Sequence, residues 1–256
     1  MLLPASFQMK IINAIYMYFF LQIMDDPDGE ICCNVEKWCH LVSCLTSDQK
    51  LKLASTSLRC MTQIPPIKMR TVLLKYMLEV FDKTSQKFII QNSVGEISVT
   101  PVDVECILGL ENKGLSGYDI IEEEGEDVKA RIPRHFVSKT TGNIVVDELV
   151  AYIVTKKEAD DDFLRMVILV LIGTVLAPMG TKVIPKVYYA LVEDVDRISD
   201  INWNAFTLST LKIHITLVKT GGHIRQWPKG NLAILQVLFV FSSNNFPVLY
   251  LYFFAV

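Results

Sequence analysis

The chain has 256 residues, of which 51% are hydrophobic and 21% are charged. That composition supplies enough apolar material for one large domain, or for one domain with extensions. The formal net charge of -3 excludes a globally positive field that would draw the protein to nucleic acid or to anionic lipid.

The six cysteines are few for this length, and five of them lie between Cys32 and Cys60. This usage, without any Asn-x-Ser/Thr acceptor, favours a soluble protein of a reducing, intracellular compartment. An apolar run at residues 11–24 contains Asn13 and Gln22, and it is shorter than the roughly 18 to 20 residues of a membrane span. We therefore expect a buried helix or a misplaced start at this end rather than a membrane anchor or a signal peptide.

The first amphipathic helix is expected between the helix-breaking pair Pro65-Pro66 and a polar turn at residues 82–87. Its apolar positions recur at i, i+3, i+4, i+7, i+8, i+11 and i+12, which places them on one stripe of a helix. These positions are Met69, Val72, Leu73, Tyr76, Met77, Val80 and Phe81.

Two β-prone runs follow, at residues 88–90 and 97–99. The intervening residues 92–96 include Gly95 and are typical of the turn of a hairpin. The sequence therefore predicts one small β-hairpin after the first helix.

Residues 100–109 predict a short helix whose two ends are both specified. Thr100 is a good N-cap, Pro101 suits the first helical position, and Asp103 lies three residues beyond the cap. Gly109 supplies the left-handed conformation that ends such a helix. Its apolar residues are expected to face the core, and these are Val102, Val104, Ile107 and Leu108.

Two acidic runs follow along the chain. The first, at residues 122–127, lies within residues 111–134, which we expect to form a solvated loop between an N-terminal subregion and a C-terminal helical layer. The second, Asp160-Asp161-Asp162, directly precedes a strongly apolar helix, where carboxylates cap exposed N–H groups and suit the helix dipole. A metal-dependent nuclease site built from the two runs is the alternative, because clustered carboxylates can bind divalent cations.

Asn202-Trp203 opens a further helix, which we expect to end at Gly221-Gly222. A stripe of five residues lines one side of it, so Trp203 is expected to anchor the core rather than to stack on a base. The stripe is Trp203, Phe206, Thr210, Ile213 and Leu217.

Residues 237–256 form an uncharged, mostly apolar tail with no shared helical or strand period. Every valine codon begins with GT, as introns usually do, so read-through of an intron from Val237 onward is one explanation of the tail.

Together these elements predict a mainly α (α+β) fold, with about eight helices around a single core and one small β-hairpin. The domain is expected to span residues 47–236, with an N-terminal extension at residues 1–46 and the tail at residues 237–256. The residues expected inside the core are Leu73, Met77, Val104, Leu108, Val167, Leu171, Trp203 and Phe206.

The order of these elements resembles the plant mobile domain, sometimes labelled "aminotransferase-like", of plant transposon-encoded proteins and some host relatives. The first likeness is the pattern I-x-[VI]-T-x-x-D-V-x-x-[IV]-L-G-L after a helix that ends in an Asp turn. It falls on Asp82, Ile97, Val99, Thr100, Asp103, Val104, Ile107, Leu108, Gly109 and Leu110. The apolar block FLRMVILVLIGTVLAP, the pair Asn202-Trp203 and the element GNLAILQ follow in the same order, with Asn231 where the family commonly has a cysteine.

The resemblance implies a noncatalytic protein of transposon ancestry with a nuclear role in protein interaction or regulation. Some host relatives are linked to meristem maintenance and to transposon silencing. The expected partner is another protein, and nucleic acid is disfavoured by the net charge.

No residue pattern indicates a catalytic, cofactor-binding or metal-binding site. Cys32-Cys33, Cys39-His40 and Cys44 supply thiols and imidazole, but their spacing is not that of structural zinc, so buried free thiols are expected. The four histidines, His40, His135, His214 and His223, stand in no hydrolase motif. The run Met179-Gly180-Thr181-Lys182 lacks the βαβ context of a pyridoxal phosphate or nucleotide site. A degenerate hydrolase or nuclease and a weak nucleic-acid-binding module remain the alternatives.

Overall fold

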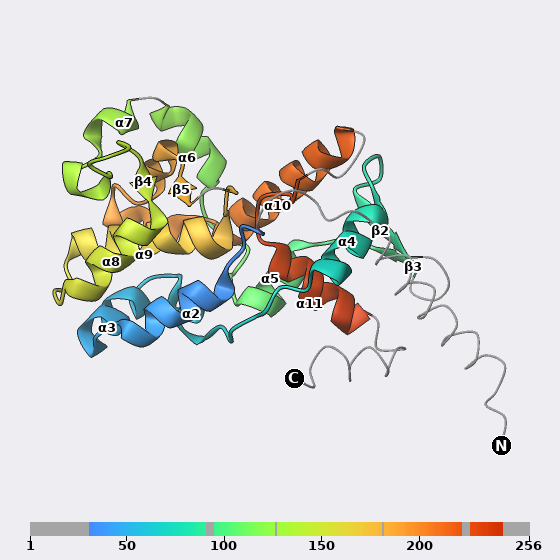
Figure 1. Ribbon diagram of the computed structural model, residues 1–256, viewed down its shortest axis with the longest axis horizontal. Coiled ribbons are helices and arrows are strands. Elements are labelled where there is room, and N and C mark those ends of the chain that lie inside the picture. The colour runs from blue at the N-terminus through green and yellow to red at the C-terminus, as the bar shows by residue number, and fades with distance from the viewer. Residues whose placement is uncertain (1–30, 91–94, 126, 181, 222–225, 243–256) are drawn as a thin grey trace, which may run out of the picture.

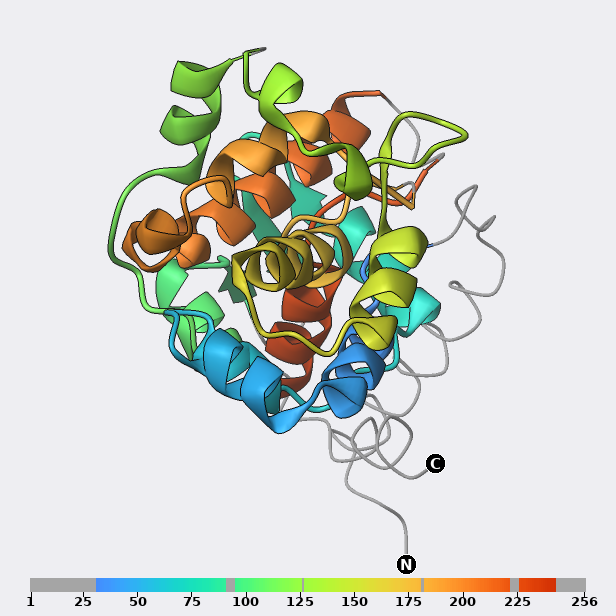
Figure 2. The ribbon, with the colours of Figure 1, turned by 90° about the vertical axis from the view of Figure 1, so that its left-hand side faces the viewer.

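Helix α9 (Asp161–Leu171) lies at the centre of the structure, a computed structural model that describes residues 31–90, 95–125, 127–180, 182–221 and 226–242. From Phe163 onward every residue of α9 is buried except Arg165. A helix that is apolar all round must be covered all round. Figure 2 shows α9 end-on, in gold near the middle of the view, with other helices around it.

The apolar helix continues into a π-helical turn, η3 (Ile172–Leu176). Within this turn the Thr174 carbonyl accepts a hydrogen bond of 2.8 Å from the amide of Asn34. Asn34 is the N-cap of helix α2, so this bond joins the start of α2 to the π-helical turn. Gly173 is required there, because a Cβ atom would lie only 2.7 Å from Ile184 Cγ1. The segments around Asn34 and Ile184, which are distant in sequence, thus both contact this turn.

The elements around α9 come from distant parts of the chain and form the larger lobe in Figure 1. They include one antiparallel pair of two-residue strands, Ile144 opposite Ile184. The elements are α2 (Val35–Cys44), α3 (Ser47–Ala54), η1 (Arg59–Gln63), α6 (Gly117–Glu124), α7 (Val128–Arg131), η2 (Arg134–Phe136), β4 (Ile144–Val145), α8 (Val146–Thr155), β5 (Val183–Ile184), η4 (Lys186–Leu191) and η5 (Val195–Asp200).

The other side of the molecule holds a three-stranded antiparallel sheet in the order β1-β2-β3 with the helices that pack near it. Helix α10 runs between the two sides in Figure 1. These elements are α4 (Thr71–Glu79), β1 (Phe81–Asp82), β2 (Lys87–Ile90), β3 (Gly95–Ile97), α5 (Pro101–Leu108), α10 (Trp203–Thr220) and α11 (Leu232–Ser242).

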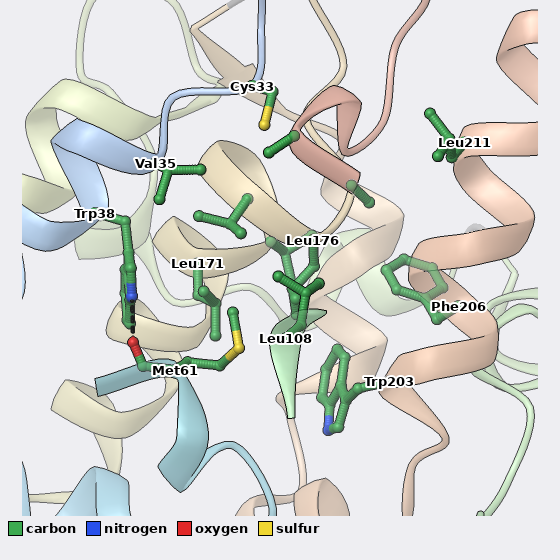
Figure 3. Packing of buried hydrophobic residues seen from close by; sticks show 14 of the residues in the cluster. Cys33, Val35, Trp38, Met61, Leu108, Leu171, Leu176, Trp203, Phe206 and Leu211 are labelled. Carbon is green, nitrogen blue, oxygen red and sulfur yellow. Dashed lines mark hydrogen bonds between the residues drawn. The ribbon is translucent and has the colours of Figure 1, made fainter. Parts of the chain in front are cut away.

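Two buried tryptophans join elements around the central helix, α2 to η1 and α10 to η5. The Trp38 indole N–H donates to the Met61 carbonyl at 2.7 Å, and that of Trp203 donates to the Ile198 carbonyl at 2.9 Å. Figure 3 shows both rings packed in one apolar cluster, with Leu171 between them. Because each buried N–H has a partner, these large side chains add apolar contact without an unpaired donor.

The mainly α fold with its single apolar core is confirmed, and all eight residues expected inside are buried. The hairpin is also confirmed, with Phe88 opposite Ile97, although β1 adds a third strand that the sequence did not indicate. Helix α5 has the expected capping box between Thr100 and Asp103, and Gly109 closes it at φ 71°.

Three local predictions were wrong. Residues 111–134 are not simply a loop, because α6 and α7 lie within them and bury Ile120 and Val128. Val72 is 40% exposed and Val102 is 66% exposed, since α4 and α5 turn neighbouring apolar residues inward instead. Ile213 and Leu217 are 46% and 57% exposed, because the cover over the α10 stripe ends before them.

The core begins upstream of residue 47, since Val35, Trp38 and Leu41 of α2 are all buried in it. At the other end α11 continues through Val237 to Ser242. The apolar run at residues 11–24 and the tail from residue 243 lie outside the described residues. In the part of the chain that the structure describes, no helix is both long and apolar enough to cross a membrane.

We predict that Val104→Asp unfolds the protein. Val104 is fully buried in α5, so the substitution places a charge in the core at a cost of several kcal/mol, comparable with a domain stability of about 5 to 15 kcal/mol. Val102→Asp on the same helix is the matched control, because that side chain is exposed and should leave the melting temperature nearly unchanged. Thermal unfolding followed by circular dichroism distinguishes them, and equal melting temperatures would refute the packing.

Candidate functional site

Charged side chains from several elements form ion pairs around the N-terminus of α9. Asp160 is its N-cap and accepts from the Phe163 amide at 2.8 Å, while its other oxygen pairs with Lys156 at 2.8 Å. Partial burial raises the pKa of Asp160, but hydrogen bonds from Lys156 and the Phe163 amide outweigh it and hold that pKa below its usual value. Asp161 pairs with Lys52 of α3 at 2.9 Å. The capping role expected for this run is confirmed for Asp160.

Asp162 uses its two carboxylate oxygens on two different partners. One lies 2.9 Å from Arg165 Nη1, and the other lies 2.9 Å from His135 Nε2. The His135 ring also stands 4.8 Å from the Phe136 ring and 6.3 Å from the Tyr152 ring, measured between centroids. Asp162 therefore links η2 to the start of α9, a pairing that no sequence motif indicated.

The first acidic run reaches this cluster only through arginines. Arg131 donates to both carboxylate oxygens of Glu193, at 2.7 and 2.8 Å, and it also pairs with Glu124. The hydrogen bonds that Arg131 donates to Glu193 and Glu124 raise the pKa of its guanidinium. Arg165 donates to the backbone carbonyl of Glu193 at 3.1 Å. The two acidic runs are thus separated by cations rather than gathered around a shared ligand position.

The side chains around the N-terminus of α9 do not form a metal-binding site among the described residues. Among the described residues, no group of three or more His, Cys, Asp or Glu side chains is placed to hold a metal ion. The Cys33 thiol faces Asn231 Oδ1 at 3.7 Å, whereas Cys39 donates to the Ile64 carbonyl at 3.3 Å. The expectation of buried thiols holds for Cys33 alone, since Cys106 is exposed and the other four are partly exposed.

Burial also makes Cys33, Cys39 and Cys60 less reactive. It raises the pKa of the Cys33 thiol to about 11, and it raises the pKa of Cys39 and of Cys60. Because the thiolate is both the nucleophile and the zinc ligand, a raised pKa opposes both roles.

The lysine and histidine positions considered from the sequence do not form a cofactor or catalytic site among the described residues. The Lys182 side chain is 70% exposed and lies 3.7 Å from Asp147, unlike a lysine enclosed around a cofactor. His214 is half-buried, and burial together with Lys229 lowers its pKa. His223 and Thr181 lie outside the described residues.

One contact of the C-terminal motif was not predicted. Gln236 accepts from the Arg70 amide at 2.7 Å and donates to the Lys68 carbonyl at 2.9 Å, so its side chain pairs with extended backbone as a strand would. Asn231, in the same motif, accepts from the Ile234 amide and caps α11. In the sequence, Pro65-Pro66 indicates an extended segment before α4, whose backbone could pair with a side chain such as Gln236.

The fold and its charged cluster define a mainly α-helical protein whose acidic and basic side chains join elements distant in sequence. The chain belongs to the family described as Domain of unknown function (DUF8566), whose model matches residues 31–236. No curated protein and no solved structure matches the chain significantly.

Asp162→Asn should lower the free energy of unfolding by about 1 to 2 kcal/mol, since it weakens the pairs with both Arg165 and His135. Glu122→Gln, at an exposed position of the other acidic run, should stay within about 0.5 kcal/mol of the parent protein. Urea denaturation at low and high salt measures both. Equal stability of the two variants would show that the Asp162 contacts contribute nothing.

Native alkylation with iodoacetamide should modify Cys106 well before Cys33. The rise of the Cys33 pKa from 9.0 to about 11 leaves roughly a hundredfold less thiolate at pH 8, and burial slows access further. Its reactivity should grow as the pH rises toward that pKa. Peptide mass spectrometry gives the order, and urea, which exposes all six thiols, is the control. Equal rates in the native protein would contradict the buried position of Cys33.

Proposed function

We propose that this protein is a noncatalytic plant mobile domain-like protein of transposon ancestry that acts in the nucleus through contacts with other proteins. One observation carries the noncatalytic part. The side chains best suited to acid–base chemistry or metal binding are Asp160, Asp162 and His135. Their ion pairs and hydrogen bonds join separate elements of the fold.

A general base or metal ligand needs a free lone pair directed at a substrate position. Both oxygens of Asp160 and both oxygens of Asp162 already accept hydrogen bonds or pair with cations. A nuclease would also require the two acidic runs to meet, and Arg131 and Arg165 stand between them. The same groups are well suited to fastening helices together.

The family resemblance supports the remaining parts of the proposal. Its patterned residues perform roles that a shared fold would preserve: Thr100 and Asp103 cap α5, Asn202 caps α10, and Gln236 ties α11 to the segment before α4. Each of these side chains is engaged in hydrogen bonds that stabilise the fold. The exposed surface instead offers large apolar side chains that a partner protein could cover, of which Leu51 and Leu217 are each more than half exposed.

The proposal predicts that the tagged full chain, purified from plant nuclei, retains reproducible protein partners and shows no hydrolase, nuclease or transaminase turnover. The full chain is used because α2, upstream of residue 47, belongs to the core. Affinity purification with mass spectrometry, assays on the purified protein and its zinc content are the measurements.

Turnover that disappears in His135→Ala, or one bound zinc that is lost in Cys39→Ser, would overturn the noncatalytic assignment. Exclusion of the tagged protein from nuclei, or the same co-purifying proteins with an unrelated tagged control, would overturn the nuclear interaction role.

A further inference from the structure

Helix α10 carries one continuous, mostly apolar stripe, and the part of the chain that the structure describes covers only its first half. Trp203, Phe206 and Thr210 are buried, whereas Ile213 and Leu217 are 46% and 57% exposed. Steps of three and four residues place all five on one face of the helix. Thr220 extends the exposed half by one more step and is exposed as well.

The covered half shows what kind of element fits this face. Helix α6 lies on it closely enough that a Cβ atom at Gly117 would stand 3.1 Å from the Phe206 ring. Tyr118 packs its ring 5.3 Å from that of Phe206 and places its hydroxyl 2.8 Å from the Thr210 hydroxyl. The outer side of α6 is acidic, with Asp119 and Glu122 exposed. The stripe is therefore matched, within this chain, by a short amphipathic helix with carboxylates.

The uncovered half continues that surface and is flanked by positive charge. In Figure 1 the C-terminal half of α10 runs away from α6. No Asp or Glu occurs within Trp203–Thr220, while Lys212 and Lys219 lie seven residues apart on the same side of the helix. Lys219 donates to the Glu79 carbonyl at 3.3 Å and lies near the Asp82 carboxylate, whose pKa is lowered mainly by hydrogen bonds from Ser85 and Thr84 and further by Lys219. Among the described residues no carboxylate pairs with Lys212, so the charge complement beside Lys212 is an acidic element.

We propose that the exposed half of the α10 stripe, formed by Ile213, Leu217 and Thr220, docks a short amphipathic helix of a partner protein whose apolar face is bordered by carboxylates. The inference rests on the proposed interaction function and names the chemistry of the partner. The partner helix would extend the layer that α6 begins, with its carboxylates near Lys212 and Lys219.

Fluorescence anisotropy with two labelled peptides tests this docking on the full chain. Both peptides are alanine-based helices of about 15 residues with leucines at i, i+4, i+7 and i+11, and their flanking residues are glutamates in one and lysines in the other. The glutamate peptide should bind about tenfold more tightly than the lysine peptide. Leu217→Ser should weaken its binding by about tenfold, and Lys212→Glu should reverse the preference between the two peptides. Val102→Ser, at an exposed position of α5, is the matched control and should change neither affinity.

Equal binding of the two peptides, no binding of either, or binding unaffected by Leu217→Ser would overturn the docking site. A dimer of the parent protein that Leu217→Ser dissociates, measured by light scattering, would assign the face to a second copy and would also overturn it. Melting temperatures establish that each variant is folded. If nuclear partners are retained by Leu217→Ser, only this inference fails, whereas an absence of specific nuclear partners for the parent protein removes the proposed function itself.

Discussion

The need to cover α9 on every side organises this structure. A helix with apolar side chains all round has no face that can remain in water, so its stability depends on neighbours from the whole chain. Helices α3 and α8 and the turn η5 pack on α9, and α2 packs on its continuation η3, so the neighbours come from before and after α9 in the sequence. The distant origin of the cover explains why α2 cannot be regarded as an appendage.

The charged residues near α9 complement that apolar packing. Burial of a helix is non-directional, whereas the ion pairs of Asp160, Asp161 and Asp162 each require specific neighbours, and Asp162 has two. Individually such exposed pairs contribute little to stability. Their value here is geometric, because a single run of three carboxylates determines how α3, η2 and the chain before α9 approach its N-terminus.

Local signals were sufficient wherever the information lay within a few residues. The capping box of Thr100 and Asp103, the left-handed Gly109 and the cap at Asn202 were all predictable, because each bonds to its own helix end. The exposed faces were not, since the exposure of Val102 and Leu217 depends on where other elements stop. Residues 111–134 were mistaken for a loop because their acidic composition conceals the few buried contacts of Ile120 and Val128. Likewise, nothing local to His135 or Asp162 indicates that they meet.

The segment that contains α6 and α7 combines apolar packing with ion pairs. Ile120 and Val128 are buried, both helices pack on η4, and Arg131 adds pairs with Glu124 and Glu193, which salt screens. Parts of a domain can open at a lower free energy than the whole, and such opening is visible in amide hydrogen exchange. Opening of this segment would remove Tyr118 from Phe206 and Thr210, so transient detachment of α6 would lengthen the apolar surface that α10 presents to another chain.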